Sequence, residues 1–503
     1  MRLTEKYEIS PSGLAAGLFI ATLVYLFTNN AMWAGFAFVF LFGGTFLLVS
    51  FAKAKGYSIA SMLKTTRFNS VFEKFLFLGK LLDFIAESGL VLGYGIFGSD
   101  YLARGKFSRL KRTVIAVAVF ALLYGIYFFT FGQQATGNGF IEINSFHAFM
   151  MNVSFAVAGF LGFSVYAMAL AALDIITKIS TSLPACPGIA PVIPGVDIPR
   201  VPISIPWFGW LSFLVIIMIH EGFHGILLKK EKMQVKSSGV LFLGLLPAGA
   251  FVEPDEDELK NAEERKRMKV FSAGPSSNLY SVVIFLLIAV VMGLALSPVT
   301  QDLQRQSKDL LLGVKITDVS EKIEFCNYSA ESPNKDKIKA GDFVLAVNGN
   351  AVKDMNSFFF EYNRTADGNV YSSMVLTLKR TDGSTRQETI ERDQKTGKIG
   401  VMLEEVYDTS NPETGNFLFM RGIVSGIFSF IGWTIVLSLL VGMFNYLPIA
   451  ITDGAHMAPA IFAPYISRLG IKGKKADMIV SLGFLLLFIL LIGLNALPYF
   501  FSA

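Results

Sequence analysis

The sequence predicts an α-helical polytopic membrane protein with a small, β-rich soluble domain inserted between its helices. Of its 503 residues, 53% are hydrophobic and only 17% are charged, whereas a soluble protein needs a larger polar surface. The apolar residues gather in runs close to the ~20 residues that a helix needs to cross a bilayer. One polar stretch, residues 301–411, interrupts these runs and has the alternating pattern of strands.

The apolar runs extend from one end of the sequence to the other. They cover residues 14–28 with 31–51, 114–131, 149–177, 207–228, 279–296, 417–443 and 478–500. No small-residue cleavage site follows the first run, so we expect a membrane anchor and not a signal peptide.

The net charge of +5 comes from basic clusters beside the runs, which is typical of membrane topology and not of nucleic-acid binding. Cys186 and Cys326 are too few for a disulfide framework and have no metal-site spacing.

Composition divides the chain into four consecutive parts. Residues 1–183 are amino-terminal transmembrane helices of unknown role, and residues 184–300 begin a second helical region that resumes at 412–503. Between its two halves, residues 301–411 alternate apolar and polar positions, for example around Val344 and Val375, which predicts half-buried strands.

Basic residues indicate the orientation of the second helical region. One cluster follows the run 207–228 and another, between residues 468 and 475, precedes the last run. Placing both in the cytoplasm puts the insert outside. The basic residues between 104 and 112 also have a cytoplasmic pattern, yet two runs follow them before the loop 184–206, which must lie outside. The number of membrane passes counted in the amino-terminal half is therefore wrong by one, and we expect the error in the interrupted segment 72–101.

Two of the four histidines lie in the pentapeptide 220–224, His-Glu-Gly-Phe-His. Positions four apart share a helix face, so His220 and His224 can bind one metal ion. Zinc takes such nitrogen ligands and keeps a water position open in catalytic sites, where Glu221 can act as general base. The alternative is a group of ordinary polar residues near a helix end. Within an apolar run, however, each ionisable residue costs about 2.5 kcal/mol or more, which favours the metal site.

A third ligand candidate lies in the segment 445–454, Asn-Tyr-Leu-Pro-Ile-Ala-Ile-Thr-Asp-Gly, which ends another apolar run. Pro448 interrupts helical hydrogen bonding, and irregular backbone at membrane depth is tolerated where it lines a cavity or packs on protein. Asp453 is thus a candidate carboxylate ligand, with a helix-end Asp-Gly turn as the alternative. Together with Pro448, Asn278 and Asn445 are candidates for supporting the substrate or its oxyanion, with packing contacts between helices as the alternative.

These motifs resemble those of the site-2 proteases, a family of intramembrane zinc metalloproteases with H-E-x-x-H on one helix and N-x-x-P-x-x-x-x-D-G on a later one. The resemblance implies that His220, His224 and Asp453 bind one zinc ion per chain and that Glu221 is the catalytic base. It covers roughly residues 190–300 and 415–503, including the similar segments Gly-Pro-x-x-Asn at 274–278, Gly-Ala-Phe-Val-Glu-Pro at 249–254 and Ile-Pro-Gly-Val-Asp-Ile-Pro at 193–199. Thr452 departs from the leucine that many members carry there.

The insert is similar to PDZ domains. The resemblance rests on Leu312, Gly313 and Val314 at the start of a strand and on the string Ala-Gly-Asp-Phe-Val-Leu-Ala-Val-Asn-Gly at 340–349. It implies that an extended peptide adds as a strand, with its terminal carboxylate near the first glycine. The alternative is that the domain restricts access by its bulk.

The resemblance implies hydrolysis of a peptide bond in or near a transmembrane segment, as in regulated intramembrane proteolysis. The expected partners are single-pass membrane proteins, peptide termini at the insert and the lipid bilayer, with no nucleic acid. The active site is expected toward the cytoplasmic side. A metal transporter is one alternative, although the sequence has no visible internal repeat of the kind transporters carry. A catalytically silent adaptor that acts through the insert is the other.

Overall fold

The computed structural model describes most of the chain. The described residues are 11–28, 31–52, 55–57, 59–131, 145–366, 369–370 and 372–502. They form two compact units. Unit 1 comprises Met1–Tyr166, Phe208–Leu286 and Trp433–Phe488, and unit 2 comprises Ala167–Trp207, Leu287–Gly432 and Ile489–Ala503.

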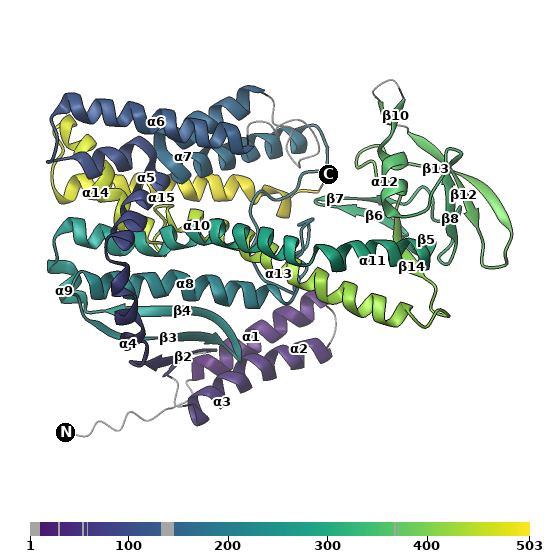
Figure 1. Cartoon of the computed structure of the whole chain (residues 1–503), viewed down its shortest axis with the longest axis horizontal. Helices are drawn as coiled ribbons and strands as arrows, with labels where there is room; N and C mark the ends of the chain where they lie inside the picture. Colours follow the sequence, from purple (N-terminus) through teal and green to yellow (C-terminus); the bar gives the residue numbers. More distant parts are fainter. Residues whose placement is uncertain are drawn as a thin grey trace. The chain divides into compact units, whose positions relative to one another are not determined.

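Among the described residues, six helices are long and apolar enough to cross a membrane. They are α5 (Lys80–Ala103), α7 (Ser145–Ser180), α8 (Gly209–Lys230), α10 (Glu264–Ala295), α13 (Thr414–Asn445) and α15 (Lys474–Asn495) (Figure 1). This confirms the predicted polytopic helical class. Helix α5 lies in the interrupted segment 72–101, where we expected the error in the count of membrane passes. Its apolar pattern is weak because much of the helix is buried inside the protein, where small and polar residues pack against neighbouring helices.

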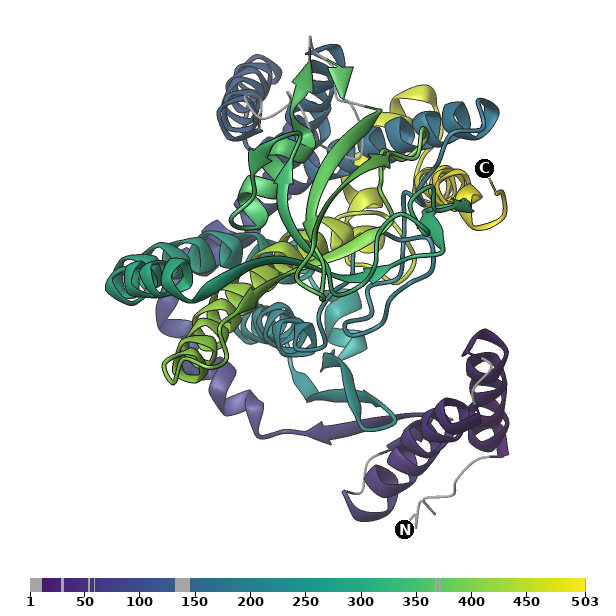
Figure 2. The same ribbon diagram turned by 90° about the vertical axis from the view of Figure 1, so that its right-hand side faces the viewer.

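Other helices complete unit 1. Near the amino terminus, α1 (Pro11–Thr28) and α2 (Ala31–Phe38) pack side by side (Figures 1 and 2). The remaining helices described in this unit are η1 (Val39–Gly43), α3 (Gly44–Phe51), α4 (Phe68–Lys74), η2 (Phe75–Leu78), α6 (Arg109–Phe131), α9 (Glu256–Asn261), α14 (Gly454–Ile466) and η3 (Ser467–Leu469).

An antiparallel sheet in unit 1 has the order β1-β2-β3-β4. Strands β3 (Val235–Leu243) and β4 (Leu246–Pro254) form the hairpin that the sequence similarity indicated at 249–254, and β4 lies beside α8 (Figure 1). Strands β1 (Lys55–Tyr57) and β2 (Ala60–Thr65) come from the amino-terminal region, for which the sequence predicted helices alone. Strand β2 pairs with β3 along its whole length, so it covers one edge of the hairpin, and β4 remains the outer strand at the other edge.

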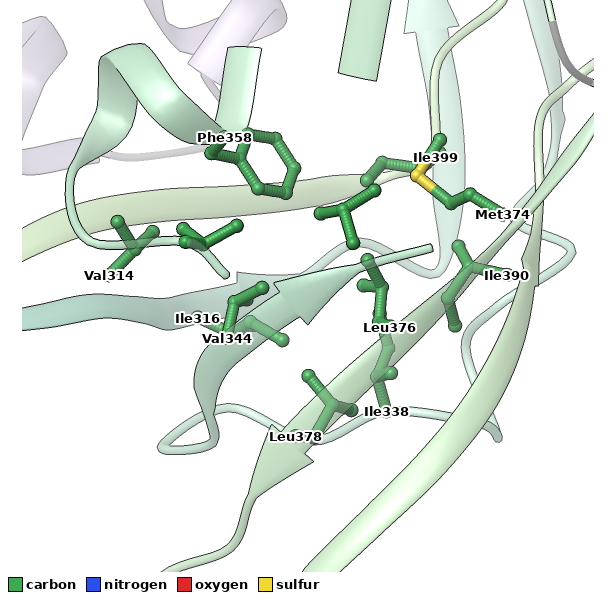
Figure 3. Close-up of a cluster of buried hydrophobic side chains, with 12 residues drawn as sticks. Val314, Ile316, Ile338, Val344, Phe358, Met374, Leu376, Leu378, Ile390 and Ile399 are labelled. Atoms are coloured by element: carbon green, nitrogen blue, oxygen red, sulfur yellow. The ribbon is translucent and has the colours of Figure 1, made fainter. Parts of the chain in front are cut away.

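Unit 2 contains the inserted domain. Its main sheet has the order β13-β12-β8-β5-β14, with β9 beside β8. The elements described in this part of the chain are α11 (Ser297–Leu310), β5 (Leu311–Val319), β6 (Lys322–Phe325), β7 (Tyr328–Glu331), β8 (Phe343–Val347), β9 (Asn350–Ala351), α12 (Met355–Asn363), β10 (Thr365–Ala366), β11 (Asn369–Val370), β12 (Ser373–Lys379), β13 (Thr385–Glu391), β14 (Val401–Tyr407) and, at the carboxyl end, η4 (Leu497–Tyr499). Alternate residues of the central strands, such as Val314, Ile316, Leu376 and Leu378, point into one buried cluster with Phe358 of α12 (Figure 3).

Strand β5 contains the predicted peptide loop, Leu312 to Val314, and lies inside the main sheet. Val314 is paired with Val344 of β8 on one side and with Glu405 of β14 on the other. An added peptide strand requires an unpaired strand edge, and neither side of β5 offers one at Val314. Gly313 pairs with Val406 of β14, and the described pairing with β8 begins only at Val314. Peptide binding by the insert remains a prediction.

The two cysteines form a disulfide, although the sequence analysis gave them no structural role. Cys186 and Cys326 are 140 residues apart and both lie in unit 2. The neighbouring Asn327 is buried and accepts a hydrogen bond from the backbone N–H of Ala185 at 2.7 Å. The loop that follows α7 is thereby joined to the turn between β6 and β7. Spacing could not reveal this pair because the two residues meet only through the fold.

Candidate active site

Three side chains from two distant parts of the sequence converge in unit 1. Nε2 of His220 lies 3.2 Å from Nε2 of His224, and Oδ2 of Asp453 lies 3.2 Å from the first nitrogen and 3.4 Å from the second. A tetrahedral zinc ion with bonds of about 2.0–2.2 Å separates its ligand atoms by about 3.3–3.6 Å. The three atoms therefore form a triangle of the size of one face of a zinc site.

Two further observations fit a metal ion at this triangle. Oδ2 of Asp453 is buried and accepts no hydrogen bond from the described residues, and such an atom is costly unless a cation compensates it. Gly274 of α10 faces the imidazoles. A Cβ at this position would lie 2.3 Å from Nε2 of His224 and 2.5 Å from Nε2 of His220. Glycine thus leaves open the space in front of both ligand nitrogens.

Helix α10 also orients the two imidazoles. The backbone carbonyl oxygen of Val270 lies 2.7 Å from Nδ1 of His224, which places the ring proton on Nδ1 and leaves Nε2 free for a metal. The side-chain amide of Asn278 lies 3.1 Å from Nδ1 of His220. The atom that faces Nδ1 is the amide nitrogen, while the buried amide oxygen has no hydrogen-bond partner among the described residues. Exchanging the two amide atoms lets the oxygen accept the Nδ1–H of His220. Asn278 is fully buried, so the structure places it behind a ligand and not on the cavity surface.

Glu221 lies between the triangle and the sheet. Its Oε2 accepts a hydrogen bond from the backbone N–H of Val252 at 3.0 Å. Because β3 lies on one side of β4 only, this N–H points to the outer edge of the sheet. The carboxylate is thereby held beside the metal ligands, at the position where a general base is required.

The ligands and Glu221 line a cavity of about 310 Å³. Asn445 also lines this cavity, with its amide nitrogen donating to the carbonyl oxygen of Val441 at 2.9 Å, whereas Pro448 lies on a neighbouring cavity. The roles predicted for Asn278, Asn445 and Pro448 in supporting the substrate stay predictions. His456 lines the cavity too and stacks on Phe271, with ring centroids 4.6 Å apart. Sequence spacing gave it no assigned role, because a lone histidine near a ligand is most often a packing residue.

The segment between Asn445 and Gly454 folds back sharply to present Asp453. The hydroxyl of Thr452, which is buried, lies 2.8 Å from the carbonyl oxygen of Ile449 and close to that of Leu447. Threonine therefore closes this turn with its own hydrogen bond. A Cβ at Gly454 would lie 2.4 Å from the carbonyl oxygen of Leu447, so the turn requires glycine.

Helix α5 contacts this same segment between Asn445 and Gly454. The phenol of Tyr94 donates a hydrogen bond to the carbonyl oxygen of Tyr446 at 3.0 Å, and the hydroxyl of Tyr446 lies 2.9 Å from that of Ser276 on α10. Gly93 allows this approach, since a Cβ there would lie 2.2 Å from the Tyr446 ring. The sequence analysis assigned no role to α5. Its glycines at 89, 93 and 98 could have indicated that α5 packs closely against other helices, because small residues are enriched where membrane helices approach each other.

A comparison with known protein families matches the part of the chain that carries this site. The model of peptidase family M50, the site-2 protease family, matches residues 208–490, which is more than half of the chain and contains all three ligand candidates. The uncharacterized protein MJ0971 of Methanocaldococcus jannaschii is 29% identical over 254 residues, a match that covers 50% of this chain and 57% of that protein. The chain thus matches little more than half the length of this relative.

Proposed function

The chain belongs to peptidase family M50, and we propose that it is a zinc-dependent protease that cleaves membrane proteins within or near their transmembrane segments. The observation that carries this proposal is the triangle of His220, His224 and Asp453 beside the carboxylate of Glu221. Family membership supports a membrane metallopeptidase. The donor set of two imidazoles and one carboxylate supports zinc, which favours nitrogen and oxygen ligands with one position open.

A bound zinc ion supplies Lewis acidity, which lowers the pKa of a coordinated water molecule and polarises a peptide carbonyl. Glu221 accepts the proton of the attacking water and then donates it to the leaving amine nitrogen. The hydrogen bond from Val252 holds this carboxylate in place. Asn445, whose side chain lines the cavity, is the better placed of the two asparagines for contacting the substrate carbonyl, whereas Asn278 supports a ligand.

The substrate has to be extended when it is cut, because a helix hides its backbone carbonyls and a membrane offers no water to satisfy them. Strand β4 is an outer strand that borders the cavity through Val252 and Pro254. Apart from the Val252 N–H, which Glu221 occupies, its outer edge offers backbone hydrogen bonds to an unwound stretch of substrate. These features favour single-pass transmembrane segments as substrates, as regulated intramembrane proteolysis requires.

The orientation proposed from the basic clusters gains support from the disulfide. Disulfides persist in oxidising compartments and are rare in the cytosol. The pair Cys186–Cys326 lies in the loop 184–206 and the insert, both expected outside the cytoplasm. Lys229 and Lys230 end α8 within two turns of His224, which supports an active site toward the cytoplasmic side. We propose that the insert restricts access or binds peptide termini on the outer side.

The test is cleavage of a panel of single-pass transmembrane proteins by purified, liposome-reconstituted protein, comparing the wild type with Glu221→Gln. Glutamine keeps an acceptor for the Val252 N–H but cannot take a proton. We expect zinc near one per chain in both forms and a loss of cleavage of about 10²- to 10⁴-fold in the variant. Wild-type protein without zinc would overturn the proposal. Zinc without cleavage by either form would favour the silent adaptor or the transporter.

A further inference from the structure

We propose that a groove between α14 and α15 receives a bulky apolar side chain of the substrate's transmembrane segment, next to the bond that is cut. This inference rests on the proposed function and adds a specificity site to it. The groove has a volume of about 370 Å³, at the lower end of the range of about 300–1,000 Å³ for small-molecule sites. Ala450, Ala455, Ala458 and Pro459 line one side, and Ser481 and Leu482 line the other.

Continuity with the metal-binding cavity argues for the substrate as the occupant. Ala450 lines both the groove and the cavity that contains the zinc ligands and Glu221. Successive residues of an extended chain are about 3.3 Å apart and point to opposite sides. A peptide held in the cavity therefore directs the side chain of a nearby residue past Ala450. The small side chains of Ala455 and Ala458 leave the space for it.

The groove also offers a polar feature that an extended peptide can use. Proline has no backbone N–H, so Pro459 cannot donate to the carbonyl of Ala455, four residues earlier. Pro464 likewise cannot donate to the carbonyl of Ala460, but Arg104, the residue that follows α5, donates a hydrogen bond to this carbonyl at 3.4 Å. No described group outside α14 donates to the Ala455 carbonyl, and this residue lines the groove.

This carbonyl distinguishes a substrate from a lipid chain. An unwound peptide must satisfy each N–H that has left its helix, because bilayer hydrocarbon cannot accept hydrogen bonds. A lipid acyl chain has no donor to offer. Apolar contact alone also gives little preference in a membrane, since lipid is as apolar as leucine. Shape and a backbone hydrogen bond together favour a peptide in this groove.

Ser481 is the position at which the proposal can be tested without disturbing the core. It lies in α15, lines the groove and is exposed. Ser481→Phe fills the groove, and Leu486→Phe is the matched control on the same helix, at a residue that is 58% exposed and does not line the groove. The probes are model single-pass peptides with a Leu/Ala transmembrane segment, one helix-destabilising Gly-Asn pair, and Ala, Val, Leu or Phe at each position beside the cleavage site.

We expect the wild type to prefer Leu or Phe over Ala at one of these positions by about 10- to 200-fold, the range for filling an apolar pocket. The Ser481→Phe variant should no longer cleave the peptides with a large residue at this position, but it should still cleave the Ala peptide. The preference for large residues is thereby abolished. Leu486→Phe should behave as the wild type. Unchanged preference in Ser481→Phe would overturn the proposal, because the groove would then not contact the substrate.

A photo-crosslinking arm separates this inference from the proposed function. A model peptide with photo-leucine at the preferred position, bound to the Glu221→Gln protein, should be captured by groove-lining residues such as Leu482, and an excess of unlabelled Leu peptide should reduce this capture more than an Ala peptide does. Capture only by residues outside the groove would overturn the inference, even if the wild type cleaves. Peptide capture without wild-type cleavage would leave a substrate groove in a protein whose proposed chemistry has failed.

Discussion

The phenol of Tyr94 donates a hydrogen bond to the backbone carbonyl of Tyr446, 3.0 Å away, at the residue that follows the end of α13. This bond joins α5, a helix of the amino-terminal region, to the segment that carries Asp453. Tyr94 is fully buried and its ring also meets the edge of the Tyr446 ring. Part of the amino-terminal region thus positions the candidate ligand Asp453, although it supplies no candidate ligand itself.

Tyr94→Phe should weaken zinc binding while it preserves the fold. The ring volume remains, but a buried carbonyl loses its donor, which costs about 1–3 kcal/mol and corresponds to a change of at most roughly 150-fold in affinity. The measurement is zinc affinity by competition with a chelator, together with cleavage rate. Tyr124→Phe on α6, whose ring stacks with Phe120, is the control and should change neither. Equal zinc affinity in Tyr94→Phe and the wild type would contradict a positioning role.

Gly274→Ala should abolish metal binding. The new Cβ would lie within 2.3–2.5 Å of both ligand nitrogens, and neither imidazole can retreat, because Val270 and Asn278 hold their opposite sides. Gly293→Ala lies on the same helix and meets nothing within 4 Å, so it should keep zinc and activity. Zinc content by atomic absorption decides between them. A Gly274→Ala protein that retains one zinc per chain would show that the ion binds elsewhere.

The two asparagines should respond differently to the same substitution. Asn278→Ala removes the partner of a ligand imidazole and should lower zinc affinity by roughly 10- to 100-fold. Asn445→Ala should leave zinc affinity unchanged and lower kcat, by up to about 10²- to 10³-fold if its amide stabilises the oxyanion. Zinc titration and steady-state kinetics on both variants separate the roles. The assignment fails if Asn445→Ala loses zinc or Asn278→Ala changes kcat alone.

The disulfide should report the orientation of the protein in its membrane. In intact cells, a membrane-impermeant maleimide should label Cys186 and Cys326 only after treatment with an impermeant reductant, because the pair is oxidised and outside. Lys232→Cys, placed just after α8 in a Cys186→Ser/Cys326→Ser background, should be labelled only once the cells are opened. Labelling of Lys232→Cys in intact cells would reverse the proposed orientation.

Local sequence determined much of this protein. Long apolar runs predict membrane helices because a bilayer admits few other structures. The two histidines and the glutamate of residues 220–224 predict a metal site because one helical turn brings them together whatever the rest of the chain does. Alternation in the insert likewise predicted strands such as β8 and β12, and Pro448 with Gly454 predicted the break that presents Asp453.

Contacts between distant segments were decided by the tertiary structure alone. Tyr94 and Tyr446 are 352 residues apart, and neither carries a local pattern that names the other. The same holds for the disulfide, for the strand β2 beside β3, and for Val314, which is paired with a strand on both sides. Spacing encodes partners that one helix or strand brings together, whereas packing between elements depends on the shapes of all of them at once. The sequence by itself therefore determined which residue types make up the candidate site, and only the tertiary structure decided which other residues hold them in place.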